Sequence, residues 1–205
     1  MKILKQLANS VVIFAGDDLK LTEDGTTGNG WTAPMFTTAN AELEDVDGLP
    51  PGYRGSRFTR INGVWAVLPE HQAQISADIA ENLAVKQAAA WERIKAERDR
   101  RKVLGVKVGA HWFHSDADSR IQQLGLVIMG ASVPAVQWKT LTLSGKPVFV
   151  TMTQALAGGI FQGTAAADAA IFAAAEAHLV AMKASATPDA YDITSGWPAS
   201  IGDAK

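Results

Sequence analysis

The segment GVKVGAHWFHSD, residues 105–116, contains the residue types that come closest to a catalytic or metal-binding motif in this chain. Imidazole nitrogens and carboxylate oxygens are common zinc ligands. However, His111 and His114 lie three positions apart, and in an extended segment such side chains point to opposite faces. Asp116 has instead the position and type of a residue that caps a following helix. We therefore predict no metal, no cofactor and no catalytic residue in this chain.

Two other segments carry weaker signals for binding. Three glycines lie between residues 25 and 30, but no Lys-Ser or Lys-Thr pair follows them, so we predict a flexible loop rather than a phosphate-binding loop. The basic run 93–102 is interrupted by Glu97 and Asp99, which is typical of a solvated helix face. A contact with an acidic partner chain is the alternative for this run. We expect no nucleic-acid binding, because aromatic residues do not interleave with these basic residues.

Composition excludes further classes of site. The chain has 205 residues, of which 47% are hydrophobic and 20% charged, and its net charge is -2. It contains no cysteine, so disulfides, thiolate metal sites and cysteine nucleophiles are excluded. A membrane-spanning helix needs about 20 apolar residues. The alanine-rich segment 164–184 comes nearest to this length, but Asp168, Glu176, His178 and Lys183 interrupt it, and we expect no membrane insertion.

The elements that must position these residues begin with a small β-rich module over residues 1–69. Segments in this part alternate polar and apolar residues, which is the pattern of half-buried strands. The sequence SRFTRINGVWAVLP predicts a hairpin. Its arms are Ser56–Ile61 and Val64–Leu68, and Asn62-Gly63 forms a two-residue turn.

Residues 70–104 predict one long helix, because glycine and proline are absent from its body and apolar residues recur at helical spacing. Such a helix is about 50 Å long and needs a partner along its length. We predict that an apolar stripe on this helix is buried against other copies of the chain in a homo-oligomer. The alternative is a monomer in which a helix over 153–184 folds back onto the stripe. The predicted stripe consists of Ile75, Ile79, Leu83 and Ile94.

Residues 105–187 predict a helix–hairpin–helix module, and residues 188–205 a poorly structured tail. Two short strands flank Gly109-Ala110, and a helix then begins near Asp116. Ile121, Leu124 and Ile128 form its predicted apolar face. A second hairpin turns at residues 144–146, and Thr153 begins the last helix. The expected fold class is therefore α+β: a β-rich N-terminal module, a long connecting helix and a C-terminal helix–hairpin–helix module.

A specific pattern covers residues 85–184: a tryptophan, then Ile-Lys-x-x-Arg-Asp, then Gly-x-x-x-Gly-x-x-Trp-Phe, then Asp-x-x-Ser-Arg. In this pattern the region resembles a domain of unknown function that recurs in tail-fibre and tail-fibre assembly proteins of tailed bacteriophages and prophages. The first part of the chain looks like the small β-rich leader that often precedes that domain. The resemblance implies no catalytic or cofactor residue. The signature positions in this chain are Trp91, Arg98, Trp112, Phe113, Asp116 and Arg120.

The resemblance implies a non-enzymatic tail component, part of or attached to the tail fibre or baseplate. Such a protein is made in the host cytoplasm and resides in the tail of the virion. Its expected partners are other tail proteins, further copies of itself and a host-surface receptor. A trimer is favoured, because tail fibres are commonly three-fold. A tail-fibre assembly chaperone, absent from the finished particle, is the alternative, and a hydrolase acting on the cell envelope is a third.

Overall fold

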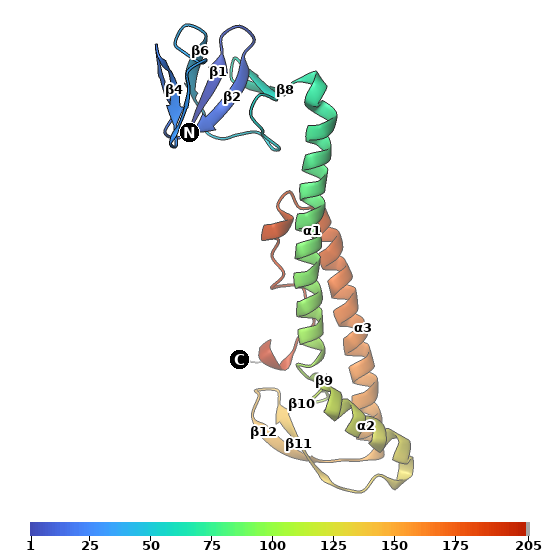
Figure 1. Cartoon of the computed structure of the whole chain (residues 1–205). Helices are drawn as coiled ribbons and strands as arrows, with labels where there is room; N and C mark the ends of the chain where they lie inside the picture. Colours follow the sequence, from blue (N-terminus) through green and yellow to red (C-terminus); the bar gives the residue numbers. More distant parts are fainter. Residues whose placement is uncertain (204–205) are drawn as a thin grey trace. The chain divides into compact units, whose positions relative to one another are not determined.

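The computed structural model describes residues 1–203 and shows the predicted mixed α+β fold. The chain divides into two compact units, Met1–Ala84 and Val85–Lys205. The helix α1, Gln72–Lys102, contributes residues to both (Figure 1). A 3-10 turn, Pro69–His71, leads directly into it. The predicted continuous helix is present, but it ends at Lys102, before the predicted limit at residue 104, and it is shared between the units instead of forming a part of its own.

The first unit is built from two antiparallel sheets. The larger sheet has the strand order β6-β1-β2-β7-β8, and the smaller has the order β3-β4-β5. The strands are β1 Lys2–Gln6, β2 Val11–Gly16, β3 Lys20–Thr22, β4 Gly25–Gly28, β5 Trp31–Ala33, β6 Ala41–Asp45, β7 Phe58–Ile61 and β8 Val64–Val67.

The central strand β1 is covered on both of its faces. Consecutive residues of a strand point to opposite faces, yet Ile3 and Leu4 are both fully buried. Ile3 belongs to a cluster with Val12 and Val46. Leu4 belongs to a second cluster, whose partly buried members include Leu21 of β3 and Trp31 of β5. The small sheet therefore covers one face of β1, and the second face has a core of its own.

The hairpin of β7 and β8 has the predicted turn. Ile61 pairs with Val64, so that Asn62 and Gly63 form a two-residue connection. Both turn residues have positive φ, 49° and 80°. This is the conformation that a type I′ turn requires, and Asn-Gly adopts it with little strain.

The first turns of α1 pack against the turn around Gly52 in the same unit. Ile75 is 1% exposed. The Arg54 guanidinium forms an ion pair with Asp78, with an N–O distance of 3.1 Å. A Cβ atom at Gly52 would lie 3.0 Å from Cγ1 of Ile79, so the turn approaches the helix closely.

The second unit combines the rest of α1 with a four-stranded antiparallel sheet of order β12-β11-β10-β9 and two further helices. The helix α2 lies between β10 and β11 in the chain, so the two predicted hairpins join in one sheet. Phe113 and Ile160 are fully buried in the core between the sheet and α3. The elements are β9 Val106–Val108, β10 His111–Phe113, α2 Ala117–Met129, β11 Gln137–Thr142, β12 Pro147–Thr151 and α3 Gln154–Ala184.

The helices α1 and α3 lie side by side and antiparallel (Figure 1). Ala90 and Ile94 of α1 are buried in one cluster with Ala175 and Met182 of α3. This is the arrangement of the monomeric alternative, in which the 153–184 helix folds back onto the stripe. The glycines of α3 do not interrupt it, and the helix is continuous over 31 residues.

Within the single chain the predicted stripe is divided, and its burial against other copies remains a prediction. Ile75 and Ile94 are buried, but Ile79 is 38% exposed and Leu83 is 41% exposed. The neighbouring residues 80–86 are all exposed as well.

The reason for this exposure is the length of α3. Gln87 donates a hydrogen bond to the carbonyl oxygen of Lys183 at 3.4 Å, and α3 ends at Ala184. The second unit therefore covers α1 only from about this level onward. Of the four stripe residues, only Ile79 and Leu83 remain accessible to another chain.

The prediction of a poorly structured tail over residues 188–205 is wrong for the described part. The Arg93 guanidinium donates to the carbonyl oxygens of Asp189 and Tyr191, at 2.5 and 2.6 Å. The Trp197 indole donates to the Ile193 carbonyl oxygen at 2.8 Å. Tyr191, Ile193 and Trp197 all pack against the α1–α3 cluster. This segment lacks long helices or strands, yet its aromatic residues complete the core.

We predict that Ile94→Ala lowers the free energy of unfolding by about 2–5 kcal/mol, because it leaves a cavity where α1 contacts α3. Val180→Ala, at a position on α3 that is 71% exposed, is the control and changes stability by less than about 0.5 kcal/mol. Urea unfolding followed by tryptophan fluorescence measures both. Equal effects of the two substitutions would contradict the packing of α1 against α3.

Candidate functional site

Four of the six signature residues lie on the short path from β10 into α2, and two lie on α1. Arg120 makes more side-chain hydrogen bonds than any other of the six. Its Nε donates to the carbonyl oxygen of Ser115 at 2.5 Å, and its Nη2 donates to the carbonyl oxygen of Lys102 at 2.8 Å. Its two Nη atoms also donate to both carboxylate oxygens of Asp168, at 2.6 and 2.9 Å. One side chain thus joins the end of α1, the start of α2 and the middle of α3.

The pair of Arg120 and Asp168 has the bidentate geometry in which a planar guanidinium binds a carboxylate most strongly. The hydrogen bonds from Arg120 to Asp168 raise the pKa of the guanidinium, and partial burial opposes that rise. Because the two charges neutralise each other, the pair itself carries no net charge. The pair can hold helices together, but it presents no free acid or base.

Ser115 completes the junction at the end of α1. Its hydroxyl donates to the Lys102 carbonyl oxygen at 2.7 Å and accepts from the Gly105 amide at 2.8 Å. Carbonyl groups in the last turn of a helix lack partners within the helix. Ser115 and Arg120 both supply a donor to one of them. Gly105 has a φ of +92°, and a Cβ atom there would lie 2.3 Å from the Ile201 side chain, so only glycine fits.

Asp116 is the N-terminal cap of α2, as predicted. Its carboxylate accepts from the Ser119 amide at 3.0 Å and from the Ser119 hydroxyl at 2.8 Å. These hydrogen bonds favour the ionised carboxylate, and the amide bond contributes most to lowering the pKa of Asp116. The carboxylate has a local structural partner and does not face another acidic group.

Trp112 and Phe113 are buried, whereas the two flanking histidines diverge. Phe113 is fully buried, and Trp112 is 5% exposed. The His111 ring lies on the same side of β10 as Phe113, with ring centroids 6.4 Å apart. His114 is exposed, and its backbone carbonyl accepts a hydrogen bond from the Gln123 amide. Among residues 1–203, no three His, Cys, Asp or Glu side chains gather as metal ligands. The absence of a bound metal remains a prediction.

The two signature residues on α1 contact different partners. Trp91 packs beside the cluster of Ala90 and Met182. The Arg98 guanidinium lies 4.9 Å from the centre of the Phe172 ring on α3. It also donates to both carboxylate oxygens of Asp99. The structure therefore does not bring all six signature residues into one site.

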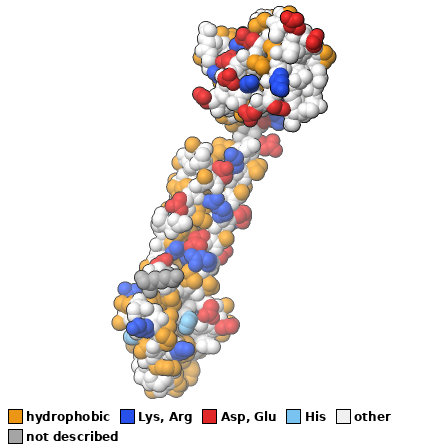
Figure 2. Space-filling model, turned by 90° about the vertical axis from the view of Figure 1, so that its left-hand side faces the viewer, with side chains coloured by type: hydrophobic (Ala, Val, Ile, Leu, Met, Phe, Trp, Pro, Cys, Tyr) orange, Lys and Arg blue, Asp and Glu red, His pale blue; other side chains and the backbone are white. Residues whose placement is uncertain are grey.

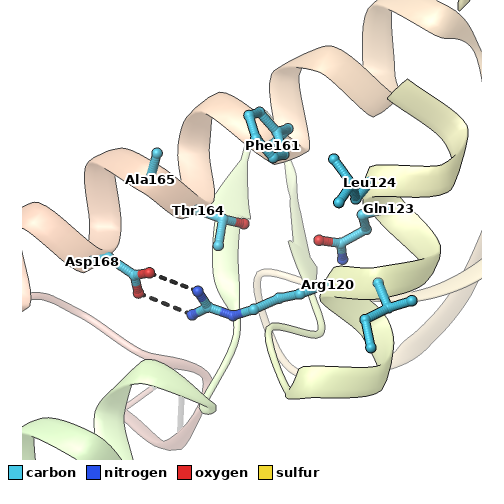
Figure 3. Close-up of a pocket in the computed structure, with 8 residues that line it drawn as sticks. Arg120, Gln123, Leu124, Phe161, Thr164, Ala165 and Asp168 are labelled. Carbon is cyan, nitrogen blue, oxygen red and sulfur yellow. Dashed lines mark hydrogen bonds and ion pairs between the residues drawn. The ribbon is translucent and has the colours of Figure 1, made fainter. Parts of the chain in front are cut away.

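A hollow of about 340 Å³ lies between α2 and α3, beside Arg120 and Asp168 (Figure 3). In Figure 3, Leu124 extends from α2 and Phe161 from α3, on the two sides of the hollow. The apolar side chains and the neutralised ion pair suit it to an apolar group better than to an ion. Its lining consists of Arg120, Ile121, Gln123, Leu124, Phe161, Thr164, Ala165 and Asp168.

The predicted apolar face of α2 is wrong, because it points away from the core. Ile121 is 68% exposed, Leu124 is 44% exposed and Ile128 is 76% exposed. The inward face is instead held by a polar residue, Gln123, which is 2% exposed and donates to the His114 carbonyl oxygen at 2.7 Å. Arg120 holds the same face through its contact with α3. These two polar contacts set the rotation of α2.

The site residues that the sequence did not reveal are Asp168, Gln123 and Phe161. Asp168 lies 48 positions after its partner Arg120, and no local pattern connects two residues so far apart. Gln123 has the residue type of an exposed helix position. The signature pattern did indicate that Arg120 is special, but it did not indicate its partner.

The helix α3 is long and apolar enough to cross a membrane, judged by length and composition alone. The sequence expectation that this segment is too polar is therefore corrected. Within this fold α3 packs into the second unit through one face: Asp168 pairs with Arg120, and His178, which is 7% exposed, makes a 3.0 Å hydrogen bond with the Tyr191 hydroxyl. The absence of membrane insertion remains a prediction. On the face drawn in Figure 2, basic and acidic side chains are interspersed on each unit, without a large area of one sign.

Comparison with known families gives one match. A family model described as a domain of unknown function (DUF4376) matches residues 84–195. The matched range closely follows the second unit and ends at Ser195, within its C-terminal segment. No curated protein and no solved structure matches the chain.

We predict that Arg120→Lys lowers the free energy of unfolding by about 1.5–3 kcal/mol, because a lysine keeps the charge but cannot bind two carbonyls and a carboxylate at once. Arg100→Lys is the matched control. Arg100 also binds a glutamate through two hydrogen bonds, but at an exposed position, and its replacement costs less than about 1 kcal/mol. Chemical denaturation of both variants tests the role of Arg120, and equal losses would refute it.

Proposed function

We propose that this chain, which belongs to the DUF4376 family, is a non-enzymatic component of a bacteriophage tail, part of or attached to the tail fibre or baseplate. The family description states no function, so the proposal rests first on the resemblance of the signature pattern to domains of tail-fibre and tail-fibre assembly proteins. On this proposal the protein is made in the host cytoplasm and resides in the virion tail. Its partners are other tail proteins and a host-surface receptor.

The structural observation that supports this proposal best is the sharing of α1 between two units with separate cores. Ile75 belongs to the first unit and Ile94 to the second, and both are buried. A continuous helix that is anchored at both of its ends suits a protein that connects two partners. The segment 105–116 and the basic run 93–102 support it as well, because Ser115 and Asp116 are used in helix caps and Arg101 in contacts within the chain.

Self-association along α1 is part of the proposal. Ile79 and Leu83 remain partly exposed on a stretch where residues 80–86 lack cover from the chain itself. An uncovered helical segment is marginally stable in water, and burial of its apolar residues against copies of the same helix would stabilise it. A trimer is favoured, because the resemblance points to three-fold tail fibres.

A tail-fibre assembly chaperone is the second candidate. The exposed apolar residues of α2 favour it, because a chaperone must offer an apolar surface that is covered only while its client is bound. Ile121 and Ile128 are the most exposed of these residues. The two candidates differ in whether the chain stays in the finished particle.

Quantitative mass spectrometry of purified phage or prophage particles from a strain that produces this chain tests the proposal. A tail component is expected at a fixed ratio to the major tail protein. If the chain is present in the lysate but absent from intact particles, the assembly chaperone is favoured over the tail component. Free chain that never associates with particles, tail fibres or their precursors at any stage of assembly would overturn both.

We predict that Leu83→Glu lowers the mass of the assembly in solution threefold, because a charge at this position opposes burial of the exposed stripe. Asn82→Glu, at the adjacent exposed position of the same helix, is the matched control and leaves the mass unchanged. Light scattering at several protein concentrations measures both variants. If the Leu83→Glu variant has the same mass as the wild-type chain, association through α1 is refuted.

A further inference from the structure

The second half of α2, residues 124–129, is apolar on its outward face as well as toward the core. Leu126 and Val127 pack against the core of the second unit. Ile121, Leu124 and Ile128 follow one another at helical spacing on the other side, and all three are exposed. A helical segment that is apolar on all sides, as residues 124–129 are, is typical of a buried helix. The outward face of α2 therefore has the character of a contact surface.

Gly125 lies in the middle of this outward face. A Cβ atom at this position would meet nothing within 4 Å, so the chain itself does not require a glycine there. Glycine destabilises the interior of a helix, because it increases the freedom of the unfolded chain. An uncovered glycine does, however, let the backbone of another helix approach closely. The position fits a crossing point between α2 and a second helix.

The exposed stripe lies beside the hollow of about 340 Å³ between α2 and α3 (Figure 3). Leu124 and Phe161 line this hollow and are themselves partly exposed. The same surface thus offers both a projecting apolar row and a recess whose volume exceeds that of a single large side chain. A surface that has both features can pair with itself across a two-fold axis.

The charges near the surface permit contact between two copies. Arg120 and Asp168, the charged residues that line the hollow, neutralise each other. The remaining charged residue of α2 is Asp118, in its first turn. In an antiparallel pair of α2 helices that cross near Gly125, the two first turns lie at opposite ends of the contact. Two copies can therefore meet without bringing like charges together.

The size of the surface is sufficient for a dimer. Together its large apolar side chains expose on the order of 500 Å², which reaches the upper range of apolar patches on monomeric proteins. Adding Gly125, Ala165 and the polar rim brings the surface toward the roughly 800 Å² per partner of a standard interface. The side chains counted are Ile121, Leu124, Ile128, Met129 and Phe161.

We propose that a second copy of this chain binds to this surface. The two α2 helices pack antiparallel about a two-fold axis near Gly125, and Ile128 of each copy enters the hollow between α2 and α3 of the other. This contact is separate from the association through α1 and does not depend on a role in phage tails.

Substitution of Ile128 by glutamate in the full-length chain tests the contact. Ile128→Glu should lower the mass of the assembly twofold and raise the dissociation constant of this contact at least tenfold, because it places a charge in an apolar interface. The melting temperature of the chain at low concentration should stay unchanged, since Ile128 is 76% exposed. Val180→Glu, at an equally exposed position on α3 far from the hollow, is the control and should leave the mass unchanged. An unchanged mass in Ile128→Glu overturns the proposal.

A single cysteine provides a test that does not depend on loss of binding. The natural chain has no cysteine, so Gly125→Cys forms a disulfide only between two copies. Mild oxidation should give a linked dimer that runs at twice the mass on a non-reducing gel. Ala177→Cys, on an exposed part of α3 outside the surface, is the control and should give at least tenfold less linked dimer. Equal cross-linking of the two variants contradicts the two-fold contact.

The outcomes separate this proposal from the previous one. A twofold loss of mass in Ile128→Glu without any effect of Leu83→Glu supports the α2 contact and removes the α1 contact. A threefold loss in Leu83→Glu alone does the reverse. A wild-type chain that stays monomeric up to high micromolar concentration overturns both contacts. If a different protein binds this surface and the chain does not self-associate, the proposal that a second copy occupies the surface is also overturned.

Discussion

The second unit depends on the position of one guanidinium group, that of Arg120. Two helices and the C-terminal end of a third must meet in this unit, and each contributes backbone or carboxylate oxygens that need donors. Arg120 supplies donors to Lys102, Ser115 and Asp168 together. The fixed fork of a guanidinium can bind in several directions at once, whereas a single ammonium group cannot. The same contact determines which face of α2 points inward, and so leaves its isoleucines on the surface.

The two ends of α1 are stabilised in different ways. Its first turns pack against a tight turn, where Gly52 allows Ile75 and Ile79 to come close and Arg54 pairs with Asp78. Its later turns are covered by α3 and by the C-terminal segment, and Arg101 is buried among Glu97, Pro198 and Trp197. The basic residues near the end of α1 are therefore partly structural. Arginines of this run donate hydrogen bonds to carbonyl oxygens and carboxylates of their own chain. The basic run is therefore in part used within the chain.

The sequence predicted the features that neighbouring residues determine. The Asn62-Gly63 turn, the cap at Asp116 and the start of α3 at Thr153 each depend on residues within a few positions of one another. The features that it did not predict depend on pairs far apart in the chain. Hydrophobic spacing alone suggested that the isoleucines of α2 face inward, because it does not include the polar contacts that fix the rotation of the helix. Likewise, the sequence after residue 187 lacks a helix or strand pattern and predicted a poorly structured tail. Tyr191 and Trp197 nevertheless supply core contacts from irregular backbone.

The contribution of the C-terminal segment has a consequence for the order of folding during synthesis. Ala90 and Ile94 emerge from the ribosome early, but their buried neighbours Ala175 and Met182 follow only some 80 to 90 residues later. Trp197 follows later still. The first unit has all of its strands within residues 1–84 and can fold while the rest is being translated. The second unit must wait until its last aromatic residues are released. Until then, the apolar face of α1 is open to chaperones or to a neighbouring nascent chain.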